Sequence, residues 1–197
     1  MGFGRKIIGV SGVMGSGKST FCRILQEHFE FHWIDADKIV HDLYKPGQPG
    51  YQKIKDYFGS QFVGKKGVHR GRLRRFILKT PQKFWILNKI IHPLLAHEVN
   101  KKIVQLNKSA NVSSICIEAF YFEPHDLGKF VDQIFVVHAS DEHILKRLKS
   151  RKIPKSQLLA MLKFQRKNLP KFFTRIENNG SEKALLKKIS TLDLPLY

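Results

Sequence analysis

The chain has 197 residues, of which 42% are hydrophobic, and this is enough for one substantial core. Its 35 lysines and arginines outnumber its 16 aspartates and glutamates, which gives a formal net charge of +19 and favours anionic ligands. No apolar run approaches the ~20 residues that cross a bilayer, and the first residues lack the apolar stretch of a secretion signal. From these features we expect a cytoplasmic protein.

The first predicted elements are a strand and a helix on either side of a glycine-rich loop. Ile7 to Val10 form the apolar run of a buried strand, and apolar residues from Phe21 to Phe29 recur at helical spacing. Between them, residues 12–20 read Gly-Val-Met-Gly-Ser-Gly-Lys-Ser-Thr and fit the phosphate-binding pattern G-x-x-x-x-G-K-[ST]. Glycines in such a loop let bare N–H groups surround a phosphate chain. We therefore predict that a nucleoside triphosphate binds here.

Two side chains of this loop have predicted roles of their own. Lys18 can reach the β- and γ-phosphates, and the Ser19 hydroxyl can ligate the Mg²⁺ that accompanies the nucleotide. A helix that begins at residue 18 adds the attraction of its N-terminal dipole. The predicted nucleotide-binding residues of the loop are Met14, Gly15, Ser16, Gly17, Lys18, Ser19 and Thr20.

An acidic pair follows the second predicted strand, which covers residues 31–34. Asp35 and Asp37 lie where α/β proteins place their chemistry, at the carboxyl end of a strand. The spacing alone does not decide between them, and we expect one of the two to be mainly structural, as a helix cap or an ion-pair partner. A short helix over residues 39–43 and a turn over residues 46–50 come next.

Residues 51–108 have a helical pattern throughout, and we predict that His92-Pro93 kinks or restarts the longest helix. Further strands are predicted over residues 113–117, 132–138 and 172–177. Helices are predicted over residues 141–150, with Ser140 as the N-cap, 156–167 and 181–189. The segment from Arg147 to Lys155 is then a basic turn between two helices.

Strands that alternate with helices predict an α/β fold of three layers, with a five-stranded parallel sheet between helices. We expect a single domain over residues 1–197, with a core formed by residues 1–45 and 109–197. Residues 46–108 would be a helical insertion and a candidate subdomain that covers the substrate. Cys22 and Cys116 both lie in apolar patterns, so we expect reduced core residues and no disulfide or metal site.

A phosphate-binding loop, an acidic strand end, a helical insertion and a basic helical turn are together typical of a small phosphoryl-transfer enzyme. Over nearly its whole length the sequence resembles the dephospho-coenzyme A kinases. The residues that carry this resemblance are 9–20, Ile34-Asp35-Ala36-Asp37-Lys38-Ile39, Lys45-Pro46-Gly47-Gln48-Pro49, Tyr57-Phe58-Gly59, Arg70-Gly71-Arg72-Leu73-Arg74, Ile91-His92-Pro93-Leu94, Arg147-Leu148-Lys149-Ser150-Arg151 and Asn178-Asn179-Gly180.

The resemblance implies transfer of the ATP γ-phosphate to the 3′-hydroxyl of dephospho-coenzyme A. It makes Asp37 the better candidate for the base, with Asp35 second, and it assigns Arg147 and Arg151 to a lid over ATP. It also implies that the insertion of residues 46–108 binds the acceptor and that residues 147–168 form the lid. Glu123 would lie near the magnesium ion, with Glu118 as a weaker alternative. The residues that it implies at the acceptor, besides Asp37, are Ser11, Arg70, Arg74 and His92, the last as a residue that shapes the helix near the ligand and not as a catalyst.

Two other functions remain open at this point. The same parts would serve a kinase of another nucleoside or nucleotide, which only the acceptor distinguishes. A nucleic-acid-binding protein would also account for the charge of +19, but the aromatic residues are not interleaved with basic ones as a stacking surface requires. We therefore expect no specific nucleic acid partner.

Overall fold

The computed structural model describes residues 6–80, 82–109, 114–122, 126–151 and 153–194, and the chain forms two compact units. One unit consists of Met1–Asp35 and Ile103–Tyr197, and the other of Ala36–Lys102. Among the described residues, no helix has both the length and the apolar character to cross a membrane.

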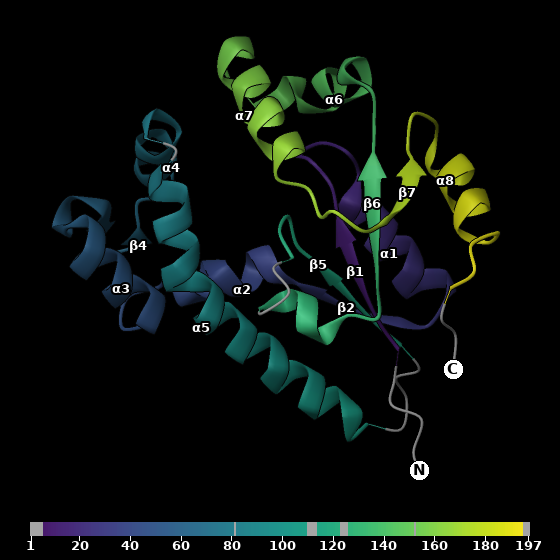
Figure 1. Ribbon diagram of the computed structural model, residues 1–197, viewed down its shortest axis with the longest axis horizontal. Helices are drawn as coiled ribbons and strands as arrows, with labels where there is room; N and C mark the ends of the chain where they lie inside the picture. Colours follow the sequence, from purple (N-terminus) through teal and green to yellow (C-terminus); the bar gives the residue numbers. More distant parts are fainter. Residues whose placement is uncertain (1–5, 81, 110–113, 123–125, 152, 195–197) are drawn as a thin grey trace. The chain divides into compact units, whose positions relative to one another are not determined.

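The first unit is built on a parallel sheet of five strands in the order β2-β5-β1-β6-β7 (Figure 1). The strands are β1 (Ile7–Ser11), β2 (Phe31–Asp35), β5 (Ser114–Glu118), β6 (Gln133–His138) and β7 (Thr174–Glu177). Because every pairing is parallel, all five carboxyl ends share one edge of the sheet. This confirms the predicted α/β fold and brings the loop after β1 to the same edge as the ends of β2 and β5.

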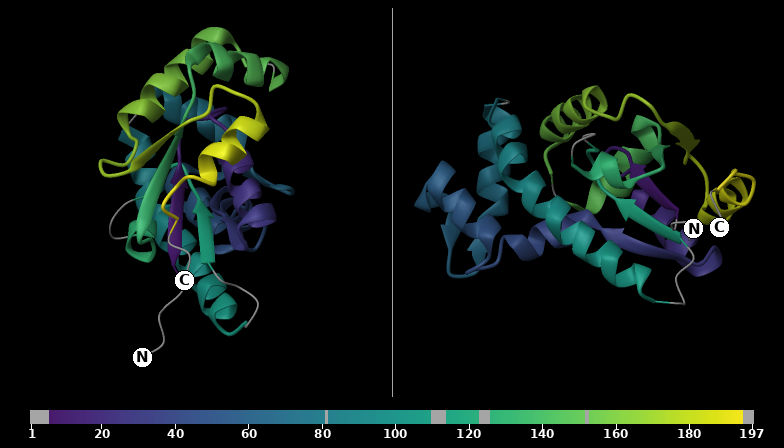
Figure 2. Two further views of the ribbon diagram at one scale, coloured as in Figure 1. Left: turned by 90° about the vertical axis from the view of Figure 1, so that its right-hand side faces the viewer. Right: turned by 60° about the horizontal axis from the view of Figure 1, so that its bottom comes forward.

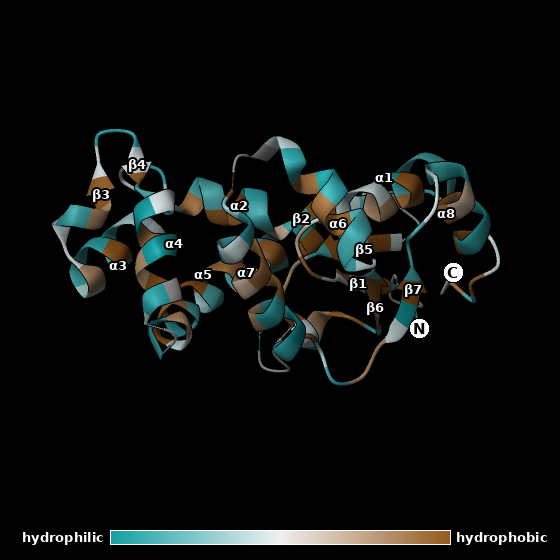
Figure 3. Ribbon diagram, turned by 90° about the horizontal axis from the view of Figure 1, so that it is seen from above, coloured by the Kyte–Doolittle hydropathy of each residue, from teal (hydrophilic) through white to brown (hydrophobic). Residues whose placement is uncertain are grey.

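Helix α1 (Lys18–His28) packs against β1, β2 and β5, with α8 (Glu182–Ile189) beside it. The strands under these helices are apolar, as the brown of β1 and β6 shows in Figure 3. Cys22 and Cys116 are buried in this core as free thiols, which confirms the prediction of reduced core residues. Burial, together with the neighbouring Cys116, raises the pKa of Cys22 well above its usual range. On the other face, the ring of Phe122 lies so close to Gly9 that a Cβ there would be 2.9 Å from it.

Two helices extend beyond the carboxyl end of β6, as Figures 1 and 2 show: α6 (Asp141–Leu148) and α7 (Lys155–Lys167). The predicted N-cap is confirmed, since Ser140 Oγ accepts a hydrogen bond from His143 N at 3.4 Å. Val13 of the glycine-rich loop belongs to the same apolar cluster as these helices. The buried members of the cluster are Val13, Ala139, Ile144, Leu148, Leu158 and Leu162.

The second unit has its own core of apolar side chains. Its elements are α2 (Ala36–Leu43), α3 (Pro49–Phe58), β3 (Val63–Gly64), β4 (Gly67–Val68), α4 (Arg70–Lys79) and the larger part of α5 (Gln82–Asn107). The buried core residues are Tyr44, Ile54, Phe62, Leu73, Ile77, Ile90 and Ile91.

The prediction of helix throughout residues 51–108 is wrong at one place, because β3 and β4 form a small antiparallel hairpin. Gly67 has φ +113°, a value that favours glycine and does not occur inside a helix. The helix α3 also begins earlier than predicted, with Pro49 in its first turn, where a proline loses no hydrogen bond.

The predicted restart at His92-Pro93 does not occur, since α5 is one helix from Gln82 to Asn107 with Pro93 inside it. A proline removes a single N–H donor and crowds the preceding turn, a cost of about 3 kcal/mol or more. Ile91 and Leu95 on either side of Pro93 are each 4% exposed. We infer that this burial holds the helix together across the proline.

Candidate phosphate-binding and catalytic site

The loop between β1 and α1 has the backbone of an anion-binding nest. Gly12, Gly15 and Gly17 have φ of +145°, +80° and +102°. A Cβ on Gly12 would lie 2.4 Å from the Val137 carbonyl oxygen, and one on Gly17 would lie 2.1 Å from Asn178 Nδ2. At Gly12 and Gly17, glycine therefore satisfies both a dihedral and a packing requirement. This geometry suits close contact between bare N–H groups and phosphate.

The lysine and the first serine of the motif lie at the start of α1. Lys18 Nζ donates to the carbonyl oxygen of Val13 at 3.2 Å, inside the loop. Ser19 Oγ donates to Glu118 Oε1 at 2.8 Å. Glu118 is only 7% exposed and is the last residue of β5, so the neighbouring strand brings a carboxylate directly to the predicted magnesium ligand.

The two aspartates after the second strand differ in environment. Asp35 is the last residue of β2 and pairs in register with Glu118, so two carboxylates end adjacent strands. Asp37 belongs to the second unit, where it is exposed in the first turn of α2. Within the described part of the chain, no group is hydrogen-bonded to its carboxylate.

Ser19 and Glu118 are suitable in kind for a magnesium ion. A hydroxyl and a carboxylate are the hard oxygen ligands that Mg²⁺ takes in proteins, together with phosphates and water. Among the described residues, no cluster of three or more histidines, cysteines, aspartates or glutamates could hold a metal by itself. Glu123, the first choice from the sequence, lies outside the described residues.

Arg147 on α6 reaches the outer side of the glycine-rich loop. Its Nη1 donates to the carbonyl oxygens of Gly15, at 3.2 Å, and Ser16, at 3.0 Å, while its Nη2 donates to Asn178 O at 2.8 Å. Asn178 Nδ2 donates to the same Ser16 carbonyl oxygen at 2.8 Å. The guanidinium thus contacts the backbone of the glycine-rich loop. The side chain of Arg151 lies outside the described part of the structure.

Four other predicted residues lie in or beside the loop. Met14 N donates to Gln165 Oε1 of α7 at 2.8 Å, which is a second link between the loop and helices α6 and α7. The Ser16 hydroxyl is fully buried and has no hydrogen-bond partner among the described residues, which leaves its proton available to a ligand oxygen. Ser11 Oγ donates to the Phe120 carbonyl oxygen at 2.7 Å. Thr20 is part of the first turn of α1.

The residues assigned to the acceptor, apart from Ser11, lie in the second unit. Arg70 and Arg74 are exposed and one helical turn apart on α4, so their side chains share a face. Burial raises the pKa of Tyr44, and the nearby positive charge of Arg70 partly opposes this rise. His92 lies on α5 and is 9% exposed.

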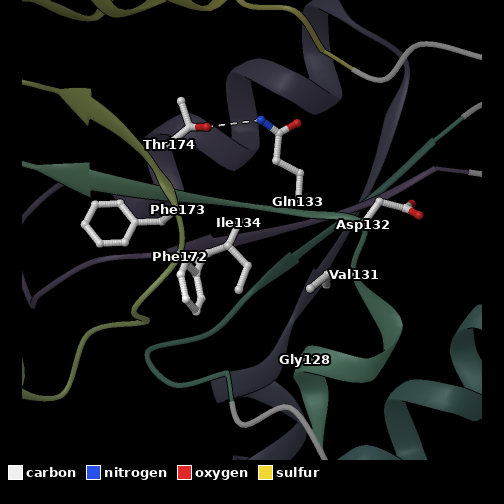
Figure 4. Close-up of a pocket in the computed structure, with 8 residues that line it drawn as sticks. All are labelled: Gly128, Val131, Asp132, Gln133, Ile134, Phe172, Phe173 and Thr174. Atoms are coloured by element: carbon white, nitrogen blue, oxygen red, sulfur yellow. Dashed lines mark hydrogen bonds between the residues drawn. The ribbon is translucent and has the colours of Figure 1, made fainter.

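A separate pocket of about 360 Å³ lies at the opposite end of the sheet, near the amino ends of β6 and β7 (Figure 4). The rings of Phe172 and Phe173 line it, and its polar groups have protein partners. Gln133 Nε2 donates to Thr174 Oγ1 at 3.1 Å, and Asp132 Oδ2 accepts from Ile7 N at 2.8 Å. The pocket shares no residue with the phosphate-binding loop.

Sequence reasoning gave no role to Asn178 or Gln165. Asn178 is part of the Asn-Asn-Gly segment that supported the family resemblance, so the sequence contained a signal without a function attached. Gln165 belongs to no sequence motif, because its hydrogen bond with Met14 depends on how α7 packs against the loop. For Glu118 the signal was its place at the end of a predicted strand.

Known proteins resemble this chain over nearly its full length. The family model for dephospho-CoA kinase matches residues 6–179. The dephospho-CoA kinase of Carboxydothermus hydrogenoformans is 35% identical over 191 residues, which cover 94% of this chain and 92% of the relative. That of Dehalococcoides mccartyi is 31% identical over 163 residues, with 81% and 80% covered.

Two solved structures have the same fold. TT1252 from Thermus thermophilus matches with a TM-score of 0.71 at 20% identity, over 94% of this chain and 95% of the other. The dephospho-CoA kinase from Campylobacter jejuni matches with a TM-score of 0.60 at 23% identity, over 93% and 94%. The family match and the close relative confirm the resemblance seen in the sequence: the chain belongs to the dephospho-CoA kinase family.

Proposed function

We propose that this chain transfers the γ-phosphate of ATP to the 3′-hydroxyl of dephospho-coenzyme A, with Lys18 on the transferred phosphate and Asp37 on the attacking hydroxyl. The observation that carries the proposed ATP site is the hydrogen bond from Ser19 to Glu118. It lies beside a glycine-rich loop whose positive φ angles suit phosphate binding. Family membership supports the acceptor and ATP as the donor. As the last step of coenzyme A synthesis, the reaction also supports a location in the cytoplasm.

The chemistry requires positioning and charge neutralisation more than covalent catalysis, because the phosphoryl group passes through a loose transition state. The N–H groups of residues 14–20 hold the donor phosphates, and the ammonium of Lys18 offsets charge that shifts toward the leaving oxygen. The carboxylate of Asp37 orients the 3′-hydroxyl and takes its proton, with Asp35 as the alternative. When bound, Mg²⁺ supplies Lewis-acid neutralisation of the phosphate oxygens, and Ser19 and Glu118 are the residues that would hold it.

The remaining assignments concern larger segments. Residues 46–108 supply the acceptor-binding insertion, in which Arg70 and Arg74 attract the pyrophosphate of dephospho-coenzyme A. Residues 147–168 form the lid, from which Arg147 and Arg151 act on ATP. In this proposal, both segments belong to a single kinase domain whose core consists of residues 1–45 and 109–197.

The test is a coupled assay of ADP release, with the coenzyme A product identified by mass spectrometry. ADP release should depend on both dephospho-coenzyme A and Mg²⁺. Lys18→Ala should lower turnover by about 10²–10³, the loss typical of a removed charge-stabilising donor. Asp37→Asn should lower it by about 10²–10⁴ if the carboxylate is the base.

The matched control for Asp37→Asn is Asp42→Asn. Asp42 is an exposed aspartate of the same helix, paired with Lys45 at 2.6 Å, and its loss should leave turnover unchanged. A wild-type protein that releases ADP with another nucleoside or nucleotide but not with dephospho-coenzyme A would overturn the acceptor. Equal activity of Asp37→Asn and wild type, with a strong loss in Asp35→Asn, would transfer the role of base to Asp35.

A further inference from the structure

The outer side of the glycine-rich loop presents one carbonyl oxygen that accepts two side-chain donors. Ser16 O receives Asn178 Nδ2 at 2.8 Å and Arg147 Nη1 at 3.0 Å. A carbonyl with two donors, one of them charged, is held firmly in direction. The peptide unit of this carbonyl ends in the N–H of Gly17.

The direction of the Ser16 carbonyl fixes the direction of the Gly17 N–H. In a planar trans peptide the C=O and N–H bonds point opposite ways. Because the carbonyl points outward to Arg147 and Asn178, the N–H of Gly17 points away from them, toward the inside of the loop. Hydrogen bonds to the carbonyl also polarise the peptide and make its N–H a stronger donor.

Asn178 is the rigid member of this arrangement. It is 5% exposed, its N donates to His138 O at 2.7 Å, and its own carbonyl accepts Arg147 Nη2 at 2.8 Å. Its amide also fills the space that a side chain on Gly17 would need, at 2.1 Å from the Cβ position. The contact explains why residue 17 must be glycine in addition to its φ of +102°.

We propose that Asn178 is a positioning residue for the phosphate donor: together with Arg147 it holds the Ser16–Gly17 peptide so that its N–H faces the phosphates. The proposal rests on the proposed function only in taking ATP as the donor. In this arrangement, Arg147 acts on the phosphates through the loop backbone, and its benefit is already present before the acceptor binds. Neither residue needs to touch the nucleotide for this effect.

The test measures binding of ATP and of inorganic tripolyphosphate by titration calorimetry, without acceptor. Asn178→Ala should weaken both ligands about tenfold, because removal of one donor from a buried acceptor disturbs the peptide. Asn178→Asp should weaken them more, since its carboxylate faces the Ser16 carbonyl. In steady-state assays, the KM for ATP should rise and that for dephospho-coenzyme A should not.

The matched control is Asn179→Ala. Asn179 Oδ1 accepts from Ser140 N at 2.8 Å, so this side chain stabilises the same turn without contacting the loop. Asn179→Ala should lower Tm yet bind tripolyphosphate as tightly as the wild type. If Asn178→Ala also binds it as tightly as the wild type, the proposal is wrong.

Arg147→Ala removes the other donor to the Ser16 carbonyl, which keeps the proposal falsifiable if Asn178 variants fail to fold. Loss of tripolyphosphate affinity is expected, since that ligand has no adenine on which the guanidinium could stack. Lys146 is an exposed residue of the same helix, and Lys146→Ala should bind tripolyphosphate as tightly as the wild type. If Arg147→Ala weakens ATP but not tripolyphosphate, Arg147 acts on the nucleoside and the proposal fails.

The double variant Arg147→Ala/Asn178→Ala should lose less affinity than the product of the single losses, because both residues act on one carbonyl. Fully additive losses would show that the two residues act separately. All these titrations omit the acceptor, so they remain informative if the chain phosphorylates something other than dephospho-coenzyme A. Absence of turnover in wild type would therefore refute the proposed function without deciding the role of Asn178.

Discussion

Glu118 illustrates how strand register places a functional group at the level of a single residue. Its Cα is in register with Val10 of β1 on one side and with Asp35 of β2 on the other. The carboxylate therefore ends between the strand that leads into the phosphate loop and the strand that leads into Asp37. Its hydrogen bond to Ser19 then links the magnesium ligand of the loop to the neighbouring strand.

We expect Glu118→Gln to reduce activity mainly through magnesium. Glutamine keeps the size and an acceptor for the Ser19 hydroxyl, but removes the negative charge that favours a cation. Residues of this kind typically contribute about 10–100-fold to metal affinity or activity. In a titration of activity against Mg²⁺, the half-saturating concentration should rise by such a factor.

Glu27→Gln is the control for this change. Glu27 is an exposed glutamate on α1 that pairs with Arg23 at 2.7 Å, so it has the same charge without access to the loop. Its magnesium titration should match that of the wild type. A Glu118→Gln variant with unchanged magnesium dependence would remove Glu118 from the metal site.

Sequence alone predicted the residues whose role depends on local order. Lys18 and Ser19 follow from the spacing of a short motif, since loop and helix are adjacent in the chain. Glu118 was the weaker alternative to Glu123, which matched the family pattern. Its bond to Ser19 joins positions 99 residues apart and requires the β1–β5 register, which the sequence does not show. The contact of Asn178 with the loop depends on the sheet order β1-β6-β7, which no short sequence pattern predicts.

At the level of whole elements, long periodic helices were predicted well and the β3–β4 hairpin was missed. The hairpin has only two residues in each strand, too few for an alternating pattern. It is defined by tertiary contacts instead: Val68 N donates to Tyr44 O at 3.0 Å and His69 N to Phe62 O at 2.7 Å. These bonds tie the hairpin to the core of the second unit.

The hairpin should be sensitive to Gly67→Ala. Gly67 has φ +113°, and a Cβ there would lie 2.6 Å from the Tyr44 carbonyl oxygen, a backbone atom that has little freedom to move. Strain of this kind costs about 1–3 kcal/mol. Denaturant unfolding should show a loss of that size, or a separate early transition for the second unit.

Gly71→Ala provides a control of opposite sign. Gly71 lies in α4, and a Cβ there would have no atom within 4 Å. Alanine should therefore stabilise the helix by about 0.5–1 kcal/mol. If both substitutions lower the free energy of unfolding equally, strain at Gly67 is not the cause of the loss.

For the molecule as a whole, the charge of +19 predicts that added salt stabilises the fold. Salt weakens both repulsion and ion pairs, so the sign depends on which is larger. With 35 basic against 16 acidic residues, the basic residues exceed the acidic ones by 19. Exposed ion pairs such as Arg23–Glu27 and Lys101–Glu98 contribute only about 0–1 kcal/mol each.

Repulsion should therefore dominate, and Tm should rise as sodium chloride shortens the screening length from about 30 Å at 0.01 M to about 10 Å at 0.1 M. A gain of 1 kcal/mol would raise Tm by about 2–4 °C in a chain of this size. A fall in Tm over this range would mean that ion pairs outweigh repulsion.

Sodium sulfate at equal ionic strength separates screening from occupation of the phosphate loop. Any additional rise with sulfate should disappear in Lys18→Ala, because screening acts on the whole surface whereas a bound anion requires the loop lysine.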